Sequence, residues 1–193
     1  MRTKLPNSNV STDKDFTIKL DAVLFQQIAE GNKDAFRILY EQTYQSIYVY
    51  LLSIVQNKEE AEDLLQETFI RVRLYVDRYS DQGKPLAWMF TIARNLAYMR
   101  LRELKKKSFQ EFETIQDMIG FSVIQNVEDR IVLEGAFQVL NDEERSIVLL
   151  HAVSGMKHKE IASILNKPLS TVLSKYNRAI KKLNQELSNN GKE

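Results

Sequence analysis

Short polar side chains and cations share one side of the segment from Pro168 to Leu183. Apolar residues take the other side, at offsets of zero, four, seven, eight and eleven from Val172. A recognition helix needs this order, because its first turns reach base edges and its later cations meet phosphates. The segment is therefore predicted to bind DNA through Ser170, Thr171, Ser174, Lys175, Asn177, Arg178, Lys181 and Lys182.

A short helix and a tight turn precede this segment. Asn166 occupies the turn, and Asn tolerates a left-handed backbone better than most residues. Pro168 presets the backbone for a new helix. From Lys157 to Lys182 there are seven Lys or Arg residues and one Glu, a net charge of +6. These features predict a helix-turn-helix, and the alternative is a helical hairpin with a solvated basic face.

A second basic patch covers residues 94–107, with six cations against Glu103. Cations interleaved with aromatic rings suit single-stranded nucleic acid, where bases stack and phosphates are neutralised. Phe90 is expected in the core, whereas Trp88 fits a core or a stacking role equally well. The aromatic residues near the patch are Tyr75, Tyr79, Trp88, Phe90 and Tyr98.

The preceding helical segment is acidic. Acids in a first turn complement the helix dipole. Here they continue past that turn, which suggests a basic protein partner. The acidic residues are Glu59, Glu60, Glu62, Asp63 and Glu67.

The apolar spacing places these residues on helices. Three segments between residues 21 and 107 carry apolar stripes at spacings of three, four and seven, which predicts a small bundle. The chain has 193 residues, with six Gly and three Pro. It has no Cys, which excludes disulfides, thiolate zinc sites and cysteine nucleophiles. No apolar run is long enough to span a bilayer and no signal peptide is visible, so we expect a cytoplasmic protein with no membrane insertion.

The expected fold is all-α, with two small helical domains joined by a flexible acidic linker. Residues 108–134 carry six acidic residues and one Arg, a net charge of −5. Asn141 and Glu144 have the spacing of a capping box. The expected boundaries are a tail at 1–20, a bundle at 21–107, a linker at 108–126, a helix-turn-helix domain at 127–187 and a tail at 188–193.

Three runs resemble the sigma-70 family of RNA polymerase sigma factors. Residues 61–72 (AEDLLQETFIRV) resemble region 2.2, and residues 88–97 (WMFTIARNLA) resemble regions 2.3 and 2.4. Residues 140–145 (LNDEER), 160–162 (EIA) and 170–179 (STVLSKYNRA) are similar to region 4. Their order and the two-domain size resemble the extracytoplasmic-function (ECF) group.

The resemblance implies a promoter-specificity factor that binds core RNA polymerase and helps to melt DNA. Core polymerase would be bound at its β′ clamp coiled coil, with a further contact to the β flap, and region 4 would recognise the −35 element of promoter DNA. A membrane-associated anti-sigma factor is a further implied partner. The resemblance assigns binding of the clamp to Glu62, Asp63, Gln66 and Glu67, and binding of the −10 element to Trp88, Arg94, Asn95, Tyr98 and Arg102.

Several positions depart from the family pattern. Met99 stands where many members carry Asp, Ser170 replaces a Gly, and Leu173 occupies a position that is often cationic. A leucine that faces DNA can contact a thymine methyl group or be merely exposed.

Two other classes of function fit the sequence less well. A stand-alone helix-turn-helix regulator would leave the acidic helix and the second basic patch without a role. An enzyme is not expected, because no Gly-rich phosphate loop is present. His151 and His158 are the only histidines, and both are expected on the surface. No metal site and no cofactor are expected.

Overall fold

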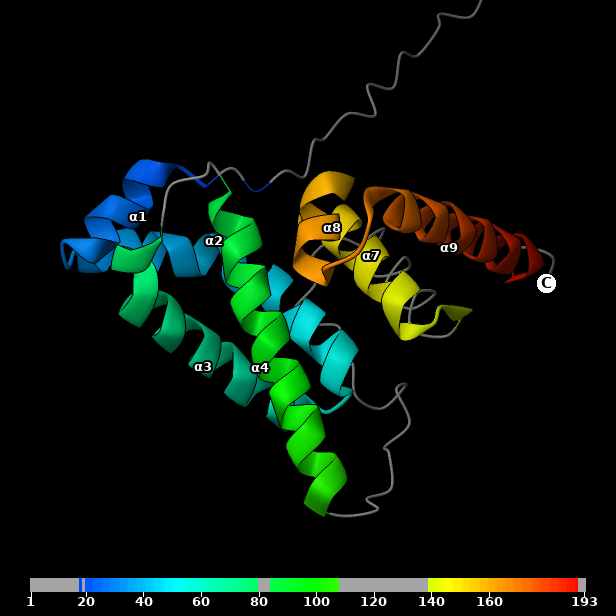
Figure 1. The fold of residues 1–193 in the computed structure, drawn as a ribbon, viewed down its shortest axis with the longest axis horizontal. Coiled ribbons are helices and arrows are strands. Elements are labelled where there is room, and N and C mark those ends of the chain that lie inside the picture. Colours follow the sequence, from blue (N-terminus) through cyan, green and yellow to red (C-terminus); the bar gives the residue numbers. More distant parts are fainter. Residues whose placement is uncertain (1–17, 19, 80–83, 108–138, 191–193) are drawn as a thin grey trace, which may run out of the picture.

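The computed structural model describes residues 18, 20–79, 84–107 and 139–190, and these residues form helices and connecting turns only (Figure 1). The all-α prediction is confirmed. The helices are α1 (Ala22–Ala29), α2 (Lys33–Val55), α3 (Lys58–Tyr75), α4 (Pro85–Lys107), α7 (Asp142–Ala152), α8 (His158–Leu165) and α9 (Leu169–Asn190), with a 3₁₀ turn, η1 (Val76–Arg78), after α3.

Asparagine side chains cap the N-terminal ends of α2 and α3, two helices of the N-terminal bundle. The Asn32 side chain accepts hydrogen bonds from two backbone N–H groups at the start of α2, and Asn57 accepts one from Glu60 N at 2.9 Å at the start of α3. These bonds satisfy donors that a helix start leaves unpaired. Between the helices, Gln56 takes a left-handed conformation with φ 51°. This tight turn makes α2 and α3 neighbours.

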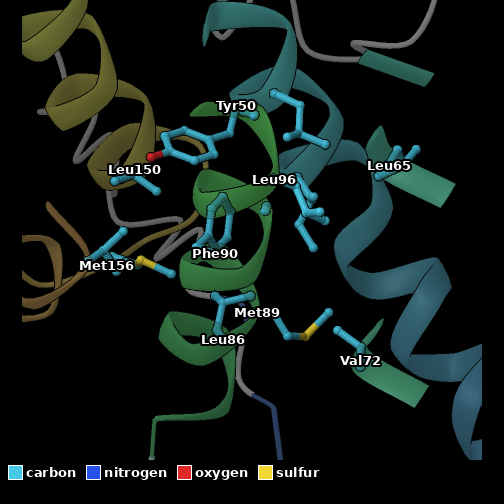
Figure 2. Close-up of a cluster of buried hydrophobic side chains, with 14 of the residues drawn as sticks. Tyr50, Leu65, Val72, Leu86, Met89, Phe90, Leu96, Leu150 and Met156 are labelled. Carbon is cyan, nitrogen blue, oxygen red and sulfur yellow. The ribbon is translucent and has the colours of Figure 1, made fainter. Parts of the chain in front are cut away.

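Helix α4 fills the space beside α2 and α3, and its inner side forms the core of the bundle (Figure 2). Met89, Phe90 and Ala93 have no exposed surface. The Phe90 ring meets the Tyr50 ring of α2 edge to face, with the centroids 5.2 Å apart. The prediction that Phe90 belongs to the core is confirmed.

The C-terminal helices form the predicted helix-turn-helix. The capping box is present, because Asn141 Oδ1 accepts from Glu144 N at 2.9 Å and Glu144 Oε2 accepts from Asn141 N at 3.2 Å. Asn166 ends α8 in the left-handed region at φ 52° and ψ 50°. Helix α9 follows after Pro168 and runs to Asn190, three residues beyond the expected domain end.

The two helical units share buried surface, which the sequence did not predict. Ile147 and Leu150 of α7 and Ile161 of α8 belong to the same buried cluster as Tyr50 and Phe90. Leu150 lies beside the Tyr50 ring in Figure 2, and α7 and α8 lie against α2 and α4 in Figure 1.

A buried guanidinium adds a polar link between the two units. Arg145 Nη1 lies 3.4 Å from the carbonyl oxygen of Ser53 in the last turn of α2. Its Nη2 donates to the Leu140 carbonyl at 3.0 Å. A cation near the C-terminal end of α2 also interacts favourably with the dipole of that helix.

Parts of the predicted organisation lie outside the described residues. The linker at 108–126 and most of the segment from 127 to 140 fall there. Residues 1–17 and 19 of the predicted tail do as well, whereas Ile18 and Leu20 are partly buried against the core. No described helix is long and apolar enough to cross a bilayer.

We expect Tyr50→Phe to leave the protein as stable as before or to stabilise it by about 1 kcal/mol. The Tyr50 side chain is 1% exposed, and among the described residues its hydroxyl has no hydrogen-bond partner. Burial also raises the pKa of this phenol. Urea unfolding followed by circular dichroism measures the effect.

Phe90→Ala is the control, because it removes a buried ring in contact with Tyr50 and should cost about 3–5 kcal/mol. A loss of more than 1 kcal/mol in Tyr50→Phe would mean that the hydroxyl is paired in solution.

Candidate nucleic-acid interface

The residues predicted to bind the −10 element all lie on α4, and none of them is fully buried. Asn95 and Arg102 are exposed, while Trp88, Arg94 and Tyr98 are half-buried. The Arg94 guanidinium lies over the Tyr98 ring, 4.8 Å from its centroid, which is within cation–π range. Arg94 Nε is buried and has no hydrogen-bond partner among the described residues. The α4 surface therefore places a cation against an aromatic ring.

Trp88 combines the two roles that the sequence left open. One side of its ring packs on Phe25 and Tyr79, with centroids 5.9 and 5.4 Å away. The residue also lines a cavity of about 250 Å³, together with Arg78 and Lys84. An aromatic ring that is held from behind and flanked by cations suits stacking of an unpaired base.

Most of the predicted −35 residues of α9 fall into two groups, and the remaining one, Thr171, is half-buried. Ser170, Leu173, Ser174, Asn177, Arg178 and Lys181 are exposed. Lys175 and Lys182 turn instead toward α7. Lys175 Nζ lies 2.7 Å from Glu143 and Lys182 Nζ lies 2.6 Å from Glu144.

The α7 carboxylates thereby fix the position of α9. Glu143 also pairs with Lys167 at 3.1 Å, and the hydrogen bonds from Lys175 and Lys167 lower the pKa of Glu143. Burial opposes ionisation of Glu144, but hydrogen bonds from Lys182 and the Asn141 backbone outweigh it and lower the Glu144 pKa. The ion pair of Lys167 with Glu143 was not predicted from the sequence. The position of Lys167 in the turn gave no sign that it would face α7.

The two predicted DNA-binding surfaces meet in this structure. Arg94 and Tyr98 of α4 line one small cavity with Thr171 and Lys175 of α9. The cavity beside Trp88 is likewise bordered by α8, at Ser163 and Ile164. Part of each surface is therefore covered by the other.

The acidic side of α3 points away from the helices that pack on it. Glu62, Asp63 and Gln66 are exposed, and Glu67 is half-exposed with a 2.7 Å ion pair to Arg71. Glu60 contacts α4 instead, through a 2.8 Å ion pair with Arg100. This contact removes Arg100 from the predicted basic patch.

Two exposed apolar residues of α3 were not predicted from the sequence as part of this surface. Ile70 and Leu74 are 53% and 63% exposed. They follow Asp63 by seven and eleven residues, which places them on the same helix side. This spacing of seven and eleven residues is visible in the sequence and could have predicted that they share the acidic side. An acidic row that continues into apolar residues is suited to contact with a protein.

His151 and His158 are less exposed than the sequence predicted. Both are half-buried, with ring centroids 4.5 Å apart, and both rings meet Tyr176 of α9 edge to face. Nδ1 of His151 lies 2.8 Å from the Met156 carbonyl, so this nitrogen is the donor. Burial, and then the neighbouring His151, lower the pKa of His158. The described residues contain no group of side chains that could hold a metal ion.

Comparison with protein families gives two matches, in chain order. Residues 39–107 match Sigma-70 region 2, and residues 130–183 match Sigma-70, region 4.

Named relatives cover most of the chain. The ECF RNA polymerase sigma factor SigM of Bacillus subtilis is 35% identical over 136 residues, which are 66% of this chain and 80% of SigM. The ECF sigma factor SigW of the same organism is 27% identical over 84% of this chain and 94% of its own length.

Solved structures share the fold. RpoE of Bartonella quintana, solved with the anti-sigma factor NepR, gives a TM-score of 0.65 at 21% identity over 79% of this chain and 96% of its own. CnrH, solved with the cytosolic domain of CnrY, gives 0.58 at 22% identity over 87% and 97%.

We expect the stability of the helix-turn-helix to fall as the pH drops from 7.5 to 5.5. A histidine with a lowered pKa in the folded state resists protonation, so its contribution is complete above its usual pKa of about 6.5 and is lost below it. His158→Gln should show a smaller fall. Thermal unfolding at both pH values measures the difference.

The carboxylates of Glu143 and Glu144 do not interfere in this pH window. Their pKa values are lowered, so their contributions are lost only below about pH 4.5. Equal pH dependence in the parent protein and His158→Gln would contradict a role for the histidine pair.

Proposed function

The chain belongs to the sigma-70 family of RNA polymerase sigma factors, in its ECF group, and we propose how its surfaces divide the work of promoter recognition. As a sigma factor it binds core RNA polymerase, recognises the −10 and −35 elements and promotes melting of the DNA. It is an initiation factor, and RNA synthesis itself belongs to the polymerase. We assign its site of action to the cytoplasm, where bacterial polymerase meets promoter DNA.

The proposal rests on one observation: the acidic and apolar surface lies on α3, whereas the surfaces assigned to DNA lie on α4 and α9. The exposed acidic and apolar side of α3 is assigned to the β′ clamp coiled coil, through Glu62, Asp63, Gln66 and Glu67. Ile70 and Leu74 extend this contact. A stand-alone DNA-binding regulator has no use for such a surface, and membership of the family disfavours that alternative.

The N-terminal bundle is assigned to the −10 element. Trp88 offers a braced ring for an unpaired base, and stacking contributes about 1–3 kcal/mol per base. This offsets the few kcal/mol that extraction of a base from the duplex costs. The other assigned residues, which supply cations and hydrogen-bond donors along α4, are Arg94, Asn95, Tyr98 and Arg102.

The C-terminal domain is assigned to the −35 element. Its contact with the polymerase is assigned to the β flap. In the major groove, the first turns of α9 would reach the bases and its later cations the phosphates. The assigned residues are Ser170, Thr171, Leu173, Ser174, Asn177, Arg178 and Lys181. Lys175 and Lys182, which the sequence also predicted to bind DNA, pair with Glu143 and Glu144 in this structure.

The domain boundaries expected from the sequence are kept as part of the proposal, with α9 continuing to Asn190. A membrane-associated anti-sigma factor is proposed as a further partner. CnrH and RpoE, which share the fold, were each solved with a partner: the cytosolic domain of CnrY and the anti-sigma factor NepR.

Asp63→Lys is expected to weaken binding to core RNA polymerase by about tenfold or more, because like charges at an interface repel strongly. Relative preference among promoter sequences should stay the same, since Asp63 lies on α3 and the assigned DNA residues lie on α4 and α9. Affinity measured by fluorescence anisotropy, together with transcription in vitro from a set of promoter variants, separates the two effects.

Glu30→Lys serves as a charge-matched control, because Glu30 is exposed at the end of α1. Altered promoter preference with unchanged polymerase affinity would refute the assignment of α3.

Binding of promoter DNA is expected to separate the two domains. The two elements lie about 25 base pairs apart, roughly 85 Å along B-form DNA. Dyes attached to Cys residues at Glu103 of α4 and Gln185 of α9 should therefore lose energy transfer when core polymerase and promoter DNA are added. The chain has no Cys of its own, so two substitutions define both labels.

A pair at Asp77 and Glu103 is the control, because both lie in the N-terminal bundle and their separation should not change. Energy transfer that is unchanged for the first pair in a transcribing complex would rule out domain separation.

A further inference from the structure

Helix α9 presents an apolar edge where a recognition helix meets base pairs. Leu169 and Leu173, one turn apart, are 42% and 40% exposed. Val172, next to Leu173, is fully buried, so the edge lies beside the seam that packs on the rest of the domain. On its other side lie exposed Ser174 and Asn177. Leu173 is therefore level with the side chains best placed to reach bases.

The charge around this edge favours a polyanion over an apolar protein surface. Arg178 and Lys181 are exposed one to two turns further along α9. The cation closest to the helix start, Lys175, is 2.7 Å from Glu143 and turns away from the exposed leucines. The first two turns thus combine apolar and small polar side chains, with phosphate-binding cations behind them.

Base pairs differ in the groups that they offer to such a surface. Guanine offers two acceptors in the major groove, which a cationic side chain binds well, whereas thymine offers a methyl group, which an apolar side chain contacts. Leu173 can make the second contact and not the first. Because Lys175 is paired with Glu143, the first two turns of α9 have no free cationic side chain for guanine.

Resting on the proposed role of α9 at the −35 element, we propose that Leu173 recognises the 5-methyl group of a thymine and sets the sequence preference at that base pair. Ser174 and Asn177 flank Leu173 and restrict its contact to one base of the pair. Because both polar side chains are short, the preference for thymine depends on the contact between Leu173 and the methyl group.

The test uses the full chain bound to bacterial core RNA polymerase. A duplex pool with a randomised upstream segment is first selected with this holoenzyme. Each thymine of the selected duplex is then replaced singly by deoxyuridine, which lacks only the 5-methyl group. One replacement in the −35 region should weaken binding by about fourfold, the factor expected for burial of one methyl group.

Leu173→Ala should bind the parent duplex more weakly and lose its sensitivity to deoxyuridine at that position. Leu173→Arg should select guanine there instead. Val23→Ala is the matched control, because Val23 is an exposed apolar residue on α1, away from the assigned surfaces. It should respond to deoxyuridine as the parent protein does.

Three outcomes overturn the proposal. The first is that deoxyuridine replaces every thymine without effect, and the second is that the Ala variant keeps the full sensitivity of the parent. Weaker binding of Leu173→Ala to core polymerase without DNA would assign the leucine to a protein contact. A holoenzyme that transcribes without protecting the −35 region from cleavage would refute the role of α9 itself, and footprinting separates this result from the other three.

Discussion

Helix α4 has to satisfy two demands at once, and the rest of the structure depends on how its sides are divided. Its inner side, with Met89, Phe90 and Ala93, fills the bundle and cannot move without opening the core. Its outer sides carry Trp88, Arg94 and Tyr98. A core helix is rigid, so the outer side chains inherit a fixed spacing from the packing beneath them. The surface assigned to unpaired DNA is therefore positioned by the most buried part of the domain.

The C-terminal domain is positioned differently, by charge as well as by apolar packing. Glu143 and Glu144 pair with lysines of the turn and of α9, and Arg145, the next residue, reaches the end of α2. One turn of α7 thus fixes the recognition helix on one side and contacts the N-terminal bundle on the other. Neighbouring charges of opposite sign can do this because successive helical residues point in different directions.

Local features of this fold could be predicted from the sequence because their causes are local. The Asn141–Glu144 capping box, the left-handed Asn166 and the buried Phe90 each follow from a few neighbouring residues. The shared cluster between α7 and Tyr50 could not be predicted, since apolar periodicity identifies a buried side but not its partner. The same limit explains the histidine pair and the ion pair of Lys175. Each depends on residues from two helices, and spacing along one helix cannot reveal it.

The meeting of the α4 and α9 surfaces implies an order of assembly. The acidic side of α3 is open in this arrangement, while Arg94, Tyr98 and Thr171 share a cavity. On the proposed assignment, a partner that binds α3 would need no rearrangement, whereas promoter DNA would bind only the fraction of molecules whose domains have separated. The apparent affinity for DNA is reduced by that fraction. Free protein would then occupy few chromosomal sites that resemble promoters, and the polymerase would be the first ligand and DNA the second.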